Sequence, residues 1–315
     1  MLTSLRRQFG FTLVELLITM TLLGLVGACV VTVVIRQQRF YRSTTALMDT
    51  RAQIRQMASV LPMDLRGISS AGGDISLLSD SALEFRSSFG SAIVCTLTSG
   101  TVFVVPPRTT AKNLRMTSWT RTPVIGDSIA LYDQFTTTKA SDDRWTMHQI
   151  TAVATVTGDV STGCPSSSKL VQATDMIASN PAYRLTISPA RPATVTQGAA
   201  IRFYRRVRYS LYKSATDSLW YLGYRDCLTG RVPVCSVTQP IGGPYRSYAL
   251  KGLNKSGLEF AYFDSLGNTT ATAKDVARIS VAIRGETGGQ LQLANGKVGT
   301  LEDSLAFEIA LRNRK

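Results

Sequence analysis

An uninterrupted apolar segment near the N-terminus constrains this chain more than any other feature of its sequence. Residues 11–35 contain one charged residue, Glu15, and no proline. As an α-helix this segment spans about 37 Å, which is enough to cross a hydrocarbon core of about 30 Å with some tilt. No other window of the 315 residues is comparably apolar. The sequence therefore predicts a chain that is anchored in a membrane by one N-terminal helix and is otherwise water-soluble.

The rest of the chain has the composition of an ordinary folded protein. Hydrophobic residues make up 44% of the sequence and charged residues 18%, which excludes a disordered chain. The formal net charge is +14, and an excess of this size suits an anionic partner such as nucleic acid. The excess is spread over the whole chain, however, so solubility and contacts between subunits explain it without such a ligand.

The five cysteines predict disulfide bonds rather than a metal site. Cys29 lies inside the apolar segment. The other four lie in the soluble part, at Cys95, Cys164, Cys227 and Cys235. They lack CxxC spacing and the chain has a single histidine, so they fit disulfides formed in an oxidising compartment. Four cysteines allow three pairings, of which we expect Cys227–Cys235 together with Cys95–Cys164.

Two common kinds of N-terminal signal explain the apolar segment incompletely. A secretory signal has a shorter apolar core and an A-x-A-like cleavage site, and a glutamate near the start of the core does not suit it. Residues 26–29, Val-Gly-Ala-Cys, resemble a lipobox, whose modified cysteine would be Cys29. Cleavage there would leave residues 30–35 as an apolar tail and would give Glu15 no role.

A third interpretation accounts for every feature of this region. Residues 5–17, Leu-Arg-Arg-Gln-Phe-Gly followed by Phe-Thr-Leu-Val-Glu-Leu-Leu, resemble the cleavage and methylation site of the type IV prepilin superfamily. The resemblance implies that a membrane-embedded aspartyl peptidase removes residues 1–10 as a leader. It cuts between Gly10 and Phe11 on the cytoplasmic side and then methylates the new amine of Phe11.

The same resemblance implies a location and a set of partners. The protein would be a single-pass inner-membrane protein with a cytoplasmic N-terminus and a periplasmic C-terminal domain, which then enters a pilus or pseudopilus filament. Its partners would be the prepilin peptidase, other major and minor pilins or pseudopilins, and the inner-membrane assembly platform. Residues 11–35 would be the transmembrane and assembly helix.

The presence of Glu15 in the apolar segment can also be explained physically, independently of the resemblance. A carboxylate at membrane depth costs about 2.5–3.5 kcal/mol on insertion scales, so it needs a partner. Cleavage creates one, because the amine of Phe11 becomes a positive charge in an apolar layer. We expect the Glu15 carboxylate of a neighbouring subunit, shifted along the filament axis, to pair with that amine and to set the axial register. The alternative is a glutamate near the membrane surface whose side chain reaches into water.

The polar segment that follows keeps a helical pattern. One apolar residue recurs every seven positions, at Phe40, Leu47, Ile54 and Leu61. This spacing predicts an apolar stripe on a helix that continues from the membrane and packs on the following domain. Pro62 should kink or restart the helix, with residues 63–68 forming a further turn. We therefore expect an amphipathic continuation over residues 36–68.

Residues 69–315 predict a β-rich periplasmic or extracellular domain. The candidate strands are Leu83–Arg86, Ala92–Leu97, Thr101–Val105, Ser128–Tyr132, Ile150–Thr157, Tyr183–Ile187, Ile201–Tyr212, Leu219–Tyr224, Leu258–Phe263, 279–284 and 305–312. In the last two, apolar and polar residues alternate, which indicates a sheet with one wet face and hence antiparallel strands. The expected fold class is α+β, a long N-terminal helix followed by a mainly antiparallel sheet.

Both ends of the chain resemble particular members of the superfamily. Residues 53–73 and 257–314 are similar to segments of W-type minor pilins and J-type minor pseudopilins, whereas residues 87–200 carry no such resemblance. Major pilins usually have a proline where this chain has Thr32, and their soluble part is much smaller. These departures favour a minor, tip or initiating subunit. The tip-most K-type pseudopilin usually lacks the glutamate, so Glu15 disfavours that position.

The sequence offers no catalytic set, so we expect neither an enzyme nor a metal or cofactor. The single histidine, His148, lies in a strand-like stretch, and GxGxxG and P-loop motifs are absent. Asp142, Asp143 and Asp159 lack EF-hand spacing, which favours a solvated turn over a calcium loop. The densest basic cluster consists of Arg202, Arg205, Arg206 and Arg208. Aromatic residues interleave it, so it could contact single-stranded DNA, although a strand with one charged face explains it as well.

Two functional hypotheses from different classes follow. The first is a structural filament subunit, a minor pilin or pseudopilin serving adhesion, twitching motility, secretion or DNA uptake, and the sequence does not distinguish among these systems. The second is a membrane-anchored binding module, for adhesion or DNA, that does not polymerise. Glu15 favours the first, because a simple anchor has no use for a buried carboxylate.

Overall fold

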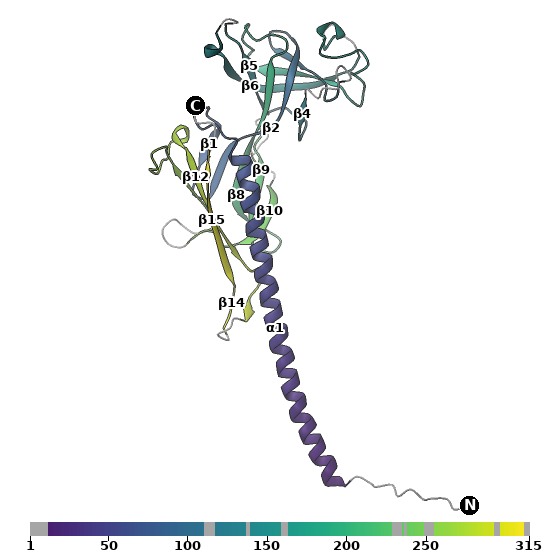
Figure 1. Cartoon of the computed structure of the whole chain (residues 1–315), viewed down its shortest axis with the longest axis vertical. Coiled ribbons are helices and arrows are strands. Elements are labelled where there is room, and N and C mark those ends of the chain that lie inside the picture. The colour runs from purple at the N-terminus through teal and green to yellow at the C-terminus, as the bar shows by residue number, and fades with distance from the viewer. Residues whose placement is uncertain are drawn as a thin grey trace, which may run out of the picture.

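A long helix and two β-rich lobes make up the computed structural model, which describes residues 12–109, 117–136, 139–158, 163–228, 235, 238–248, 255–292 and 297–311. The last turns of the helix pack into one lobe, and the second lobe lies beyond it, farthest from the N-terminus (Figure 1). The strands pair antiparallel. This is the expected α+β architecture.

Helix α1 (Leu13–Leu65) has an exposed half and a half-buried half. Its 53 residues give it a length of about 80 Å. The N-terminal half exposes apolar side chains, among them Leu13 at 77% and Leu23 at 74% exposure. The C-terminal half buries a single stripe, at Thr50, Ile54, Met57, Leu61 and Leu65. These positions recur at the helical period and so place one face of the helix against the sheet.

The stripe predicted at seven-residue spacing is buried only at its C-terminal end. Ile54 and Leu61 are buried and Leu47 is half-buried, whereas Phe40 is 71% exposed. The sheet covers only the C-terminal part of α1 (Figure 1), so the earlier members of the series have no strand to pack on.

Of the two alternatives predicted for Pro62, a kink or a restart of the helix, the structure excludes the restart. α1 continues through Pro62 to Leu65, and the amide of Arg66 donates to the carbonyl of Pro62 at 3.1 Å. A proline removes one intrahelical hydrogen bond, and here the loss falls only one turn before the helix ends. Leu61 and Leu65, both fully buried, hold this last turn against the sheet. Ile68, expected in a further turn, is buried but lies after the end of the helix.

We call the part of the molecule built around the end of α1 the helix lobe. Its strands are β1 (Ile75–Leu78), β9 (Trp220–Asp226), β10 (Thr238–Tyr245), β11 (Leu258–Phe263), β12 (Arg278–Glu286), β15 (Glu302–Ala310), the N-terminal half of β2 (Ala82–Leu97) and the C-terminal half of β8 (Ala200–Lys213). Their order is β1-β2-β8-β9-β10-β12, with β11 and β15 both paired to β12. α1 contacts β10, β12 and β15.

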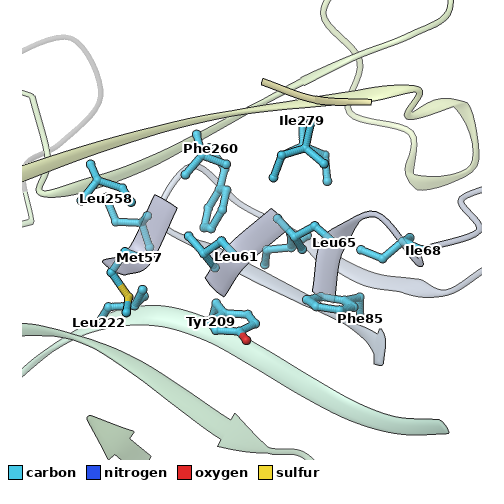
Figure 2. Close-up of a cluster of buried hydrophobic side chains, with 14 of the residues drawn as sticks. Met57, Leu61, Leu65, Ile68, Phe85, Tyr209, Leu222, Leu258, Phe260 and Ile279 are labelled. Atoms are coloured by element: carbon cyan, nitrogen blue, oxygen red, sulfur yellow. The ribbon is translucent and has the colours of Figure 1, made fainter. Parts of the chain in front are cut away.

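Figure 2 shows how the sheet encloses the end of α1. Met57, Leu61 and Leu65 lie between two parts of the curved sheet. The flanking side chains are Leu258, Phe260 and Ile279 on one side, and Phe85, Tyr209 and Leu222 on the other. Helix and sheet therefore share one hydrophobic core, so this lobe depends on α1 for its packing.

The second lobe is a closed β-barrel, which we call the barrel lobe. Its strands are the C-terminal half of β2, β3 (Thr101–Val104), β7 (Ala182–Ser188), β6 (Arg144–Val156), β5 (Ser128–Asp133) and the N-terminal half of β8. Each pairs antiparallel with the next and β8 pairs back with β2, which closes a ring of six strands. Ile129, Leu131 and Phe203 are among the buried side chains that fill its interior. The barrel is thus a packed core and not a channel.

Strands β2 and β8 belong to both lobes. They have 16 and 14 residues and pair without interruption by a loop from Ala82–Ser210 to Ile93–Ala200. The register shifts between Ser88 and Gly90. The sequence predicted two strands here, 83–86 and 92–97. Both segments are confirmed as strand, but they belong to one strand, because the polar segment between them pairs with β8 instead of turning.

Short elements complete the two lobes. Among the described residues these are β4 (Ser118–Trp119), which pairs with β2, the hairpin of β13 (Leu291–Gln292) and β14 (Val298–Gly299), and the 3₁₀ turns η2 (Ala140–Asp142), η3 (Ser166–Ser168) and η4 (Ala273–Asp275). Gly90 permits the approach of β4, because a Cβ at this position would lie 2.6 Å from the Cβ of Trp119.

Candidate assembly site and charged surface

A capping box fixes the first turn of α1. The Thr12 hydroxyl accepts a hydrogen bond from the amide of Glu15 at 3.3 Å, and a Glu15 carboxylate oxygen accepts one from the amide of Thr12 at 3.1 Å. These reciprocal bonds satisfy two of the backbone groups that a helix N-terminus leaves without partners. The Thr-x-x-Glu spacing of a capping box can be read in the sequence. The prediction for Glu15 concerned only its charge and did not include this cap.

Glu15 therefore has a local structural role besides any role in assembly. A carboxylate in the first turn also interacts favourably with the positive end of the helix dipole. Within the described part of this chain, no lysine or arginine pairs with Glu15. The predicted cleavage pair, Gly10 and Phe11, lies outside the described residues, and so does the amine expected to meet this carboxylate.

The exposed half of α1 is suited to an apolar environment. α1 is the helix long and apolar enough to cross a membrane in the described chain, and its most apolar window is not buried against the rest of the protein. Its hydroxyls bond to backbone carbonyls of the preceding turn, Thr19 to Glu15 at 2.9 Å and Thr32 to Ala28 at 2.8 Å. Such bonds satisfy polar side chains without water. α1 is continuous at Thr32, the position at which major pilins usually have a proline. Cys29 is an exposed free thiol on the same surface.

Two disulfides join the remaining cysteines in the pairing expected from the sequence. Cys95 is bonded to Cys164 in a small core beside the barrel, and Cys227 is bonded to Cys235 at the end of β9. The sequence separations are 69 and 8 residues. The first crosslink therefore closes a long loop within the barrel lobe, and the second closes a short loop in the helix lobe.

Three of the four clustered arginines on β8 are paired with carboxylates. Arg205 is buried and forms a two-pronged ion pair with Asp127, at 2.6 and 2.7 Å. Arg206 and Arg208 both contact the buried Glu84, at 2.8 and 2.5 Å. Since residues alternate between the faces of a strand, Arg205 lies on the face opposite the other two.

Arg202 is the member of this cluster whose charge is not matched by an acidic side chain among the described residues. It is exposed, and its guanidinium lies 4.4 Å from the ring centroid of Trp145, over the ring. A cation above an indole face is an attractive arrangement. Nucleic-acid contact by all four arginines stays a prediction, and Arg202 is the one that the fold leaves available for it.

The other polar residues singled out in the sequence lie in ordinary structural positions. His148 is buried in β6, with Nδ1 2.7 Å from the carbonyl of Pro189 and Nε2 2.9 Å from the Thr146 hydroxyl. Asp143 accepts from the hydroxyl of Tyr132, and Asp142 from that of Thr136. The third member of the proposed calcium loop, Asp159, lies outside the described residues.

One group of potential metal ligands occurs in the described chain, formed by Glu84, Cys227 and Cys235. Both sulfurs belong to a disulfide, so they are not thiolates. A disulfide sulfur is a poor ligand compared with the thiolate that zinc requires. In this state the three residues do not form a metal site.

Comparison with known proteins bears on the N-terminal segment alone. Residues 5–28 match the prokaryotic N-terminal methylation motif. Comparisons with curated proteins and with solved structures gave no match. The match covers residues 5–10 of the predicted leader, the predicted cleavage pair and the apolar segment as far as residue 28. Together with the exposed apolar half of α1, it supports a type IV pilin- or pseudopilin-like subunit that is processed at its N-terminus and anchored in a membrane.

Proposed function

We propose that this chain is a minor subunit, of W-type or J-type character, of a type IV pilus or a related secretion or DNA-uptake filament. The prepilin peptidase removes residues 1–10 and methylates Phe11, and the subunit then assembles with other pilins or pseudopilins through α1. The supporting observation is the start of α1, where Glu15 lacks a cationic partner within the described chain and is followed by an exposed apolar surface. The helix of a neighbouring subunit can cover this apolar surface and can also supply a positive charge for Glu15.

The size and placement of the barrel lobe favour a minor position. The barrel lobe lies at the end of the molecule opposite the apolar half of α1 (Figure 1). In a filament whose centre is built from α1 helices, a subunit of this length would carry the barrel lobe away from the membrane. A lobe of this kind suits a subunit used in few copies at the tip better than one repeated along the shaft.

The capping box allows the charge of Glu15 to be tested separately from its hydrogen bonds. Glu15→Gln keeps a side chain that can cap the helix but removes the charge. Thr12→Ala removes the cap, at a cost of about 0.5–2 kcal/mol of helix stability, but keeps the charge. We expect Glu15→Gln to lower the ratio of this protein in sheared filaments to that in membranes, with cleavage intact. Thr12→Ala should change this ratio much less.

Two outcomes of that experiment would contradict the proposal. An unchanged ratio for Glu15→Gln would remove the assembly role of the charge and favour a non-polymerising anchor. An equal loss for both variants would assign the effect to the helix start and not to the charge.

The mass of the mature protein tests the processing step. Cleavage after Gly10 leaves 315 − 10 = 305 residues that begin with N-methyl-phenylalanine at Phe11. The leader carries Arg6 and Arg7, so the formal charge falls to 14 − 2 = +12. Intact-mass measurement of the membrane-extracted protein checks this. A mature chain that begins with a diacylglycerol-modified Cys29 would instead establish a lipoprotein.

A second candidate function, a membrane-anchored module that binds single-stranded DNA, is favoured by the exposed Arg202–Trp145 stack. Aromatic and arginine side chains stack on bases with little dependence on sequence. If this function holds, Arg202→Gln weakens salt-dependent binding of single-stranded DNA, and the protein is found in membranes and not in sheared filaments. Binding that is unaffected by this substitution would leave the candidate without its site.

A further inference from the structure

A cavity of about 420 Å³ lies where the two lobes meet. Arg86 on β2 and Arg206 on β8 line it, together with residues from the loop before β1, from β5 and β6, and from the end of β7. The polar side chains around it include Ser76, Ser128, Gln149 and Ser188. A cavity of this size is in the range of small-molecule sites in proteins.

The two arginines that line the cavity lie directly opposite each other. Arg86 and Arg206 are register partners in the β2–β8 ladder. Like charges at such positions destabilise a sheet unless something neutralises them. Arg86 is held on one side, because Nε donates to Asp74 at 3.1 Å and Nη2 donates to the carbonyls of Gly72 and Gly73. Its Nη1 makes no hydrogen bond within the described chain.

In the part of the chain that the structure describes, the guanidinium of Arg206 has fewer hydrogen-bond partners than that of Arg86. Its Nε lies 2.8 Å from an oxygen of Glu84, but this contact lacks hydrogen-bond geometry and the buried Nε has no hydrogen-bond partner among the described residues. Glu84 is already engaged by Arg208, which donates to its other oxygen from Nε at 2.8 Å and from Nη2 at 2.5 Å. One buried carboxylate therefore serves two arginines.

The next strand adds to the positive charge. Arg225 on β9 is the register partner of Arg208, and its buried Nε also has no hydrogen-bond partner in the described part of the chain. Four arginines thus share one region of the sheet with two carboxylates, Asp74 and Glu84. Arg86 and Arg206 line the cavity, whereas Arg208 and Arg225 lie in the same ladders without lining it. The difference, 4 − 2, is an excess of two positive charges.

We propose that this cavity binds a small soluble ligand through a phosphate-type oxyanion group. A tetrahedral oxyanion can accept hydrogen bonds from the two guanidinium groups of the lining, Arg86 and Arg206, and from its hydroxyl donors together. The buried His148 forms part of the wall, with both ring nitrogens already engaged. The volume leaves room for a group attached to the oxyanion. Because the lining comes from both lobes, the bound ligand would join them, whether or not the protein polymerises.

The first test uses the detergent-solubilised full chain and inorganic phosphate, titrated at constant ionic strength against chloride. We expect phosphate to raise the melting temperature above the chloride control and to show saturable binding by calorimetry. Arg206→Gln should weaken the Kd for phosphate about tenfold or more, the range lost with one charge-assisted hydrogen bond. Arg202→Gln removes the same charge from the same strand outside the cavity, and should leave the Kd within about twofold.

The chloride control and the Arg202→Gln variant distinguish a phosphate site from general attraction to a basic protein. Equal effects of phosphate and chloride, or equal losses in the two variants, would mean that binding is non-specific and would overturn the proposal. Binding of polyglutamate without binding of phosphate would identify a protein partner instead, and binding only of phosphatidic-acid vesicles would identify a lipid. If Arg206→Gln fails to fold, Arg206→Lys provides the test, because the charge is kept and the planar fork is lost. An unchanged Kd in Arg206→Lys would then contradict the assignment of Arg206.

Discussion

The helix lobe and the barrel lobe bury their hydrophobic cores in different ways. The sheet of the helix lobe is open, and one of its faces is buried only because the stripe from Ile54 to Leu65 packs into it. The sheet of the barrel lobe closes on itself, so its core of residues such as Ile129 and Phe203 needs no helix. Closure also leaves its six ring strands without free edges. Only the helix lobe is therefore coupled directly to the part of the chain that enters the membrane.

The largest difference is expected when the disulfide of each lobe is removed in turn. Replacing Cys95 and Cys164 by serine opens a crosslink across 69 residues, worth about 4 kcal/mol by chain entropy. The matched pair, Cys227 and Cys235, spans 8 residues and is worth about 2.5 kcal/mol. Denaturation followed by tryptophan fluorescence can resolve the lobes, since two of the three tryptophans lie in the barrel lobe and one, Trp220, in the helix lobe. If each double cysteine-to-serine variant shifts the unfolding transitions of the two lobes equally, the lobes unfold as one unit.

An effect of comparable size should come from the cores. Leu61→Ala in α1 and Leu131→Ala in β5 each remove a fully buried side chain, at a cost of about 2–5 kcal/mol. We expect Leu61→Ala to speed amide hydrogen exchange mainly in β12, and Leu131→Ala mainly in β6. Exchange that rises equally in both strands for either variant would show that β2 and β8 couple the two cores completely.

The smallest effect concerns an ion pair that ties α1 to the edge of the helix lobe. Arg51 donates to Asp303 of β15 at 2.6 Å, and this hydrogen bond lowers the pKa of Asp303 below its ordinary value of 3.8. The stabilisation is therefore present above pH 3.8 and is lost as the pH falls through the lower, folded-state pKa. Because Arg51 is exposed and Asp303 is only partly buried, Arg51→Gln should cost less than about 1 kcal/mol at pH 7. A larger loss by urea denaturation at pH 7, or a loss that does not diminish as the pH is lowered below 3.8, would contradict this account.

The helix lobe could largely be predicted from local pattern. Apolar periodicity located α1, and alternation located β12 and β15, because each of these signals lies within one continuous segment. β10 was missed, since its sequence, Thr-Gln-Pro-Ile-Gly-Gly-Pro-Tyr, is typical of a loop. Pro240 and Gly242 are tolerated there because they fall at irregular positions of the β9–β10 ladder.

The barrel lobe could not be predicted in the same way. Its closure rests on the pairing of β2 with β8, whose partners are more than 100 residues apart in the chain, such as Ile93 with Ala200. No local period reports such a pairing, although several of the individual strands were predicted. The arginine cluster shows the same limit, because the sequence places Arg205 and Arg206 side by side while the fold directs them to different carboxylates.

The continuity of β2 and β8 has a mechanical consequence. A load applied to the barrel lobe reaches the helix lobe along two long paired strands and not through a flexible linker. Tension directed along those strands would load many hydrogen bonds of the β2–β8 ladder at the same time. If the lobes met at a hinge, the same hydrogen bonds could break one after another. A pull on the barrel lobe would therefore reach the helix lobe and α1 without passing through a flexible joint, because the lobe junction itself consists of paired strands.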